Sequence, residues 1–198
     1  MHVEWGITMN IFQDIQKASH NKIESDEAAA LAKGFSLSNS ENLEGLIRLA
    51  TLRFVLDDTA TTLKLTNLIS DIKFDNDFDI WTWVEHGLVL QSAVYRKQGK
   101  TELAKECINK IASTFENDPI NKRVFMRTLN GDGISTAYSK IQKAYDEEAE
   151  YGRRIALLWK LMLIREMGGG EEFSTDRADK EIQENIDRLK ILIESFNQ

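Results

Sequence analysis

Proline and cysteine are nearly absent from the sequence, with one residue of each in 198. A β-sandwich or β-barrel needs many turns marked by proline and glycine, and its strands alternate apolar and polar residues over sustained stretches. Because neither pattern occurs, we exclude these folds. One cysteine also excludes an internal disulfide framework. The apolar residues instead recur in steps of three and four, which predicts an all-α protein.

Positive charge is also in deficit. There are 25 lysines and arginines against 32 aspartates and glutamates, a formal net charge of -7. Binding to nucleic acid or to an anionic membrane needs a basic surface that neutralises phosphates. We therefore predict no nucleic acid and no membrane as partners. A basic protein is the expected partner, because opposite charges accelerate association.

The sequence lacks the pattern of a signal peptide and of a membrane span. Its first ten residues, MHVEWGITMN, contain no basic leader and no apolar run. The most apolar segment, residues 155–164, is flanked by Arg153, Arg154 and Arg165 and is too short to cross a bilayer. We therefore expect a cytoplasmic protein. We also predict that this segment is a central helix in which Trp159 is buried.

The length and the hydrophobic fraction of 42% are those of an ordinary globular protein. Apolar periodicity and capping residues predict about nine helices in antiparallel pairs, forming a single domain over residues 1–198. The predicted helices include residues 9–23, 25–34 and 118–129. Another predicted helix is capped by Asp58 or Thr59 and carries an apolar stripe that extends to Ile72. Met9 is a second candidate start, so residues 1–8 are a candidate disordered extension. A final helix beginning at Ser174 or Thr175 carries an apolar stripe that we expect to pack on the core.

The stretch 81–111 is predicted to be two helices joined by a tight turn at Gly99. Its apolar and small residues lie at the offsets of one tetratricopeptide repeat, and they are Leu88, Ser92, Tyr95, Gly99, Ala104, Ile108 and Ile111. The preceding helix pair aligns with it in part, Ala50 with Ser92 and Ile69 with Ile111. This resemblance to tetratricopeptide proteins implies an α-solenoid-like stack of helix pairs.

Residues that could carry catalysis or bind metal are few. His86 follows Glu85 among aromatic residues, where an acid or base is conceivable, but we favour a structural histidine. Neither Glu-x-x-His nor His-x-x-x-His spacing occurs, so we predict no metal and no cofactor. The segment DNDFD resembles a calcium loop, yet Ile80 and His86 occupy the positions where that loop needs Gly and Glu. We interpret Cys107 as a buried small hydrophobe, and we predict no catalytic residues.

One acidic and aromatic stretch remains as the predicted partner-binding site. Its members combine carboxylates, which steer a basic partner, with a ring that could be a buried anchor. The predicted partner-binding residues are Asp71, Asp75, Asp77, Asp79, Trp81 and Glu85. The alternative interpretation is that Trp81 and Trp83 belong to the core and that the aspartates only cap the following helix.

These features predict a non-enzymatic protein-binding domain. In size, acidity and lack of a catalytic set, the chain resembles the bacterial immunity proteins that neutralise toxin domains, often nucleases. That resemblance implies a basic toxin domain as the partner. Two alternatives stay open: a tetratricopeptide-like scaffold or peptide-sensing regulator, and a helical enzyme of an unrecognised kind.

Overall fold

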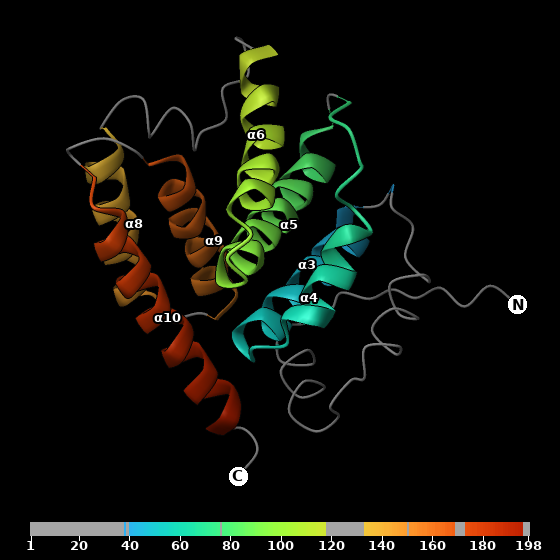
Figure 1. Ribbon diagram of the computed structural model, residues 1–198. Helices are drawn as coiled ribbons and strands as arrows, with labels where there is room; N and C mark the ends of the chain where they lie inside the picture. Colours follow the sequence, from blue (N-terminus) through green and yellow to red (C-terminus); the bar gives the residue numbers. More distant parts are fainter. Residues whose placement is uncertain are drawn as a thin grey trace, which may run out of the picture.

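A computed structural model describes residues 38, 40–75, 77–117, 133–149, 151–168 and 173–195. Figure 1 shows that these residues form helices, and strands are absent from the described ranges. The seven helices are α3 (Ser40–Val55), α4 (Thr59–Asn67), α5 (Phe78–Lys97), α6 (Thr101–Asn117), α8 (Ile134–Glu147), α9 (Tyr151–Met167) and α10 (Thr175–Ser195). The prediction of an all-α protein is therefore confirmed. The helices predicted at 9–23, 25–34 and 118–129, and the extension predicted at 1–8, lie outside the described residues.

The boundaries of α4 and α5 differ from the prediction. Asp58 caps α4 as expected, accepting a hydrogen bond from the backbone N–H of Thr61 at 3.0 Å. The predicted helix reached Ile72, whereas α4 ends at Asn67. Four of the nine residues of α4, including Thr66 near its end, are threonines. Threonine is β-branched and a poor helix former. Helix α5 begins at Phe78, three residues before the predicted Trp81, because Asp77 provides an N-cap there.

The tight turn predicted at Gly99 joins α5 to α6. Gly99 has a φ of 73°, in the left-handed region that glycine adopts without steric cost. The N–H of Lys100 donates to the carbonyl of Tyr95 at 2.8 Å, and the N–H of Gly99 donates to that of Arg96 at 2.9 Å. These two bonds form a Schellman motif, which satisfies the last carbonyl groups of α5. The chain then turns back along α5 as α6 (Figure 1).

One hydrophobic core cluster includes side chains from all seven described helices. Consecutive helices pack as the pairs α3 with α4, α5 with α6 and α8 with α9. Helix α5 lies between the α3/α4 pair and α9, as Figure 1 shows, and contacts both. Trp159 of α9 is 2% exposed, which confirms its predicted burial. None of the described helices has both the length and the apolar character that a membrane span requires.

Helix α10 packs on the core, as its apolar stripe predicted. Ile186 and Leu189 of this stripe are buried against the body of the protein. Ser174 caps the helix, since its Oγ accepts a hydrogen bond from the N–H of Arg177 at 3.3 Å. On the α8 side, the Tyr145 hydroxyl donates to the carbonyl of Asn185 at 3.2 Å. Burial raises the pKa of Tyr145 to about 12, so the hydroxyl keeps this donor proton at neutral pH.

Candidate functional site

The four aspartates of the predicted partner-binding site lie on and beside the loop between α4 and α5. Asp71, Asp75, Asp77 and Asp79 are all exposed. Asp77 also has a structural role, because its Oδ1 accepts hydrogen bonds from the N–H groups of Asp79 and Ile80, both at 3.0 Å. The alternative interpretation, in which the aspartates cap this helix, therefore applies to Asp77. The other three carboxylates leave their charge on the surface.

An open groove runs along this acidic loop. It is lined by Asp75, Asp77, Phe78 and Asp79. With Lys73 as the one cation of residues 71–79, four aspartates against one lysine give this stretch a net charge of -3. Within the described residues, no group of three or more His, Cys, Asp or Glu side chains could hold a metal ion. The groove is thus an anionic surface suited to a cationic side chain.

Trp81 and Glu85 occupy different surroundings from these aspartates. They are 4% and 5% exposed, so neither presents a surface to a partner. Trp81 packs edge-on against Phe74 with the ring centroids 5.7 Å apart, and Phe74 contacts Phe78 at 5.0 Å. The prediction of Trp81 and Glu85 as surface contacts is therefore corrected: both lie one turn or more inside α5, on its core face. Trp81 anchors the loop to the core, and the aspartates form its exposed side.

His86 lies in an aromatic cluster, and that cluster includes a tryptophan from another helix. Its ring stacks on Trp159 of α9 with centroids 4.3 Å apart, and Trp83 approaches it edge-on at 5.6 Å. Trp159 is fixed in turn, since its Nε1 donates a hydrogen bond to Thr51 Oγ1 of α3 at 2.9 Å. This arrangement joins α3, α5 and α9 and accounts for His86 as a packing residue. Trp83 is half-buried beside it.

Cys107 is buried as predicted and lies beside polar side chains. Its Sγ contacts Gln91 Oε1 at 3.6 Å, and Gln91 Nε2 donates to Asn67 Oδ1 at 2.8 Å. Burial raises the pKa of Cys107 to about 11, which leaves the thiol protonated at neutral pH. A protonated, buried thiol is a poor nucleophile, so the surroundings of Cys107 favour a packing role.

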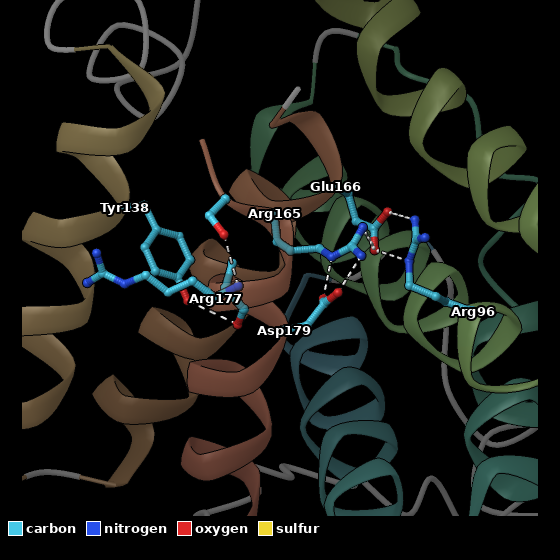
Figure 2. Close-up of polar contacts among 8 residues, drawn as sticks. Arg96, Tyr138, Arg165, Glu166, Arg177 and Asp179 are labelled. Carbon is cyan, nitrogen blue, oxygen red and sulfur yellow. Dashed lines mark hydrogen bonds and ion pairs between the residues drawn. The ribbon is translucent and has the colours of Figure 1, made fainter. Parts of the chain in front are cut away.

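A chain of ion pairs joins α5, α9 and α10, and the sequence did not predict it (Figure 2). Arg96 of α5 donates to Glu166 of α9 through Nε, at 2.9 Å, and through Nη2. Arg165 lies between Glu166, 3.7 Å away, and Asp179 of α10, to which its Nη2 donates at 2.6 Å. The Asp179 hydrogen bonds raise the pKa of Arg165. Arg96 and Glu166 are 70 residues apart, so no local spacing could indicate the pair.

A cavity of about 220 Å³ adjoins these ion pairs, between α3, α5, α9 and α10. Mostly buried apolar side chains form its floor, and more exposed charged and polar side chains surround its mouth. The floor includes Phe54, Val89, Ala93, Met162, Ile182 and Ile186, and the mouth includes Arg96, Lys97, Arg165, Glu166, Asp179 and Gln183. The acidic groove lies at the start of α5 and the cavity along its second half, so Phe78 of the groove and Arg96 of the cavity are roughly 27 Å apart along the helix at 1.5 Å per residue.

A protein-family model matches most of the chain. That model, described as "Family of unknown function (DUF6707)", matches residues 2–191. The chain belongs to this family. No curated protein and no solved structure matches it significantly.

In the described part of this DUF6707 protein, the acidic groove and the cavity differ in their chemistry. The α4–α5 loop offers carboxylates without a cationic partner among its groove-lining residues, which suits recognition of basic protein surface. The cavity offers an apolar floor beneath mixed charges, which suits a small amphipathic molecule. Neither feature places a nucleophile beside a general base.

Proposed function

We propose that the chain is a non-enzymatic protein-binding domain that binds a basic partner through the α4–α5 loop. The observation that carries the proposal is the exposed run of Asp71, Asp75, Asp77 and Asp79, which an aromatic anchor holds against the core. A loop held in place loses less conformational entropy on binding than a free one, so its charges can act on a partner at lower cost.

Within this class, a bacterial immunity protein is the function that we favour. The acidity of the chain and the acidic groove are suited to covering the basic substrate-binding surface of a toxin domain, such as a nuclease. In this proposal the protein acts in the cytoplasm and needs no cofactor. Binding would neutralise the toxin by occlusion.

A helical-repeat scaffold or peptide-sensing regulator is the second candidate. Helix α5 packs on both helices of the α3/α4 pair, which is how successive pairs stack in tetratricopeptide-like arrays. Such a protein would bind many extended peptides with similar affinity. An immunity protein would instead bind one folded partner tightly.

The experiment measures association kinetics with the product of the neighbouring gene at two salt concentrations. Opposite charge should make association fast at low salt and steeply slower at high salt, with less effect on dissociation. Asp71→Lys, Asp75→Lys and Asp79→Lys together should slow association at least tenfold. Asp77 is retained because its cap contributes about 1 kcal/mol to stability, and Asp77→Asn can test its charge separately.

A matched control reverses three exposed carboxylates on α10: Glu184→Lys, Asp187→Lys and Glu194→Lys. The change in net charge is the same, so a selective effect of the loop variant locates the site. Equal effects of the two variants would reject the loop as the binding surface. Absence of binding and of protection against any neighbouring toxin would reject the immunity function.

A further inference from the structure

We propose that the cavity between α3, α5, α9 and α10 binds a small apolar monocarboxylate, with the apolar body on the floor and the carboxylate at the mouth. The site is independent of the α4–α5 loop. Its volume is about 220 Å³. An apolar cavity of about 150 Å³ suffices to bind benzene, so this one has room for a phenyl ring and a short linker.

The floor is complementary to an apolar ring or branched chain. Phe54, Met162 and Ile186 come from three different helices and converge on the cavity. Phe54 and Met162 offer an aromatic face and a polarisable sulfur, which both contact rings favourably. Few polar atoms line the floor, so the transfer of an apolar group from water would stabilise the complex.

The mouth has a surplus of positive charge. Three cations, Arg96, Lys97 and Arg165, stand against the two carboxylates Glu166 and Asp179. Asp57, which pairs with Lys97, is shared with Lys190, so four cations against three carboxylates leave a net charge of +1. Figure 2 shows that the guanidinium of Arg165 lies between the two carboxylates, so it is fully engaged. A bound monoanion would therefore balance the mouth through the other two cations.

Lys97 and Arg96 each have a donor that takes no part in the ion pairs with Glu166 and Asp179. Lys97 Nζ lies 4.8 Å from the centre of the Phe54 ring, directly above the floor, and contacts Asp57 at 3.2 Å. Arg96 donates to Glu166 through Nε and Nη2, and its Nη1 takes no part in that pair. A carboxylate at the mouth can accept from Lys97 Nζ and Arg96 Nη1 while the Arg96–Glu166 pair stays intact.

The experiment titrates the full chain, labelled with ¹³C at the methionine methyl groups, with 3-phenylpropionate. The methyl signal of Met162, assigned through Met162→Leu, should shift saturably with a dissociation constant on the order of 1 mM. The neutral analogue 3-phenylpropionamide should bind about tenfold more weakly, because it lacks the charge-assisted hydrogen bonds. Ala93→Leu should abolish the shift by filling the cavity.

Lys97→Gln keeps the proposal testable if the filled variant is unstable, because Lys97 is an exposed residue. This change should weaken 3-phenylpropionate about tenfold and leave the amide within twofold. The proposal would be overturned if the Met162 signal showed no saturable shift up to 10 mM 3-phenylpropionate, roughly ten times the expected dissociation constant. Equal affinity for 3-phenylpropionate and 3-phenylpropionamide would also overturn it. Unchanged binding by a folded Ala93→Leu variant would overturn the location.

Discussion

At the scale of single residues, Trp159 combines ring contacts with a buried hydrogen bond. Its ring stacks on His86 and meets Trp83 edge-on with centroids 5.9 Å apart. Its Nε1 donates to Thr51 Oγ1, and that hydroxyl donates to the carbonyl of Ile47 at 2.7 Å. A buried indole N–H without a partner would cost about 1 to 3 kcal/mol, so Thr51 allows this large residue to lie in the core.

We predict that Trp159→Ala lowers the free energy of unfolding by about 3 to 5 kcal/mol, since it removes a large side chain from a packed site. Trp159→Phe should cost less, because it retains a ring. The measurement is urea denaturation followed by circular dichroism.

Thr51→Val provides the control for the hydrogen bond. Because it leaves the Trp159 N–H buried without its acceptor, the single change should cost about 1 to 3 kcal/mol. Combined with Trp159→Phe, the two changes should cost less than the sum of their separate effects. Strict additivity would contradict the coupling, and a Trp159→Ala variant as stable as the wild type would contradict the central position of α9.

At the scale of elements, the α5–α6 turn depends on backbone conformation. A Cβ added at Gly99 would meet no atom within 4 Å, so a side chain has room there. The φ of 73° is nevertheless unfavourable for residues other than glycine, with asparagine among the better tolerated. The effect of substitution at Gly99 is therefore a measure of backbone strain alone.

We predict that Gly99→Ala lowers the free energy of unfolding by about 1 to 2 kcal/mol and that Gly99→Asn costs about half as much. Gln98→Ala is the matched control, because Gln98 is exposed and has a φ of -86°. It should change stability by less than about 0.5 kcal/mol. Thermal and urea denaturation of the three variants test this order, and equal costs for Ala and Asn would show that strain is not the cause.

At the scale of the whole molecule, Asp57 connects three parts of the fold. It lies in the turn between α3 and α4 and accepts from Lys97 of α5 at 3.2 Å and Lys190 of α10 at 2.8 Å. Its φ of 63° is left-handed. The Lys190 hydrogen bond, followed by that of Lys97, lowers the pKa of Asp57. The same contact raises the pKa of Lys190.

These pKa shifts define how the contribution of Asp57 and Lys190 to the free energy of unfolding depends on pH. Because its folded pKa is lowered, the stabilisation is present above its ordinary pKa of 3.8 and is lost as the pH falls through the folded value. Because the folded pKa of Lys190 is raised, its contribution is present below 10.5 and is lost as the pH rises through the folded value. Between these limits the contribution is constant.

We predict that Asp57→Asn lowers the free energy of unfolding by up to about 1 kcal/mol at pH 7, since the carboxylate is mostly exposed and screened by solvent. Asparagine tolerates the left-handed conformation, so the variant isolates the charge. Urea denaturation at pH 3 and pH 7 should show a smaller difference from the wild type at pH 3. Lys180→Gln, which removes an ion pair within α10, is the control; a difference for Asp57→Asn that does not depend on pH would contradict the assignment.

Local sequence patterns predicted the helices of the described residues, but they misplaced the end of α4 and the surroundings of Trp81. Caps at Asp58 and Ser174 and the turn at Gly99 were predicted because each depends on a few adjacent residues. The end of α4 was placed too late, since apolar spacing continues through the turn at 68–71. For the candidate site, the exposed aspartates were predicted from charge alone. Trp81 was assigned to the surface, because adjacency to an acidic loop does not show which face of α5 a side chain lies on.

The sequence by itself determined that this protein is helical, that Trp159 and the stripe of α10 are buried, and that the 71–79 stretch is acidic. These properties follow from periodicity, hydrophobicity and composition, which act over one or a few helical turns. Only the tertiary structure decided that Arg96 pairs with Glu166, that Lys190 reaches Asp57, and that a cavity lies beneath these pairs. Contacts between residues 70 to 133 positions apart depend on how whole helices pack, and no local pattern encodes them.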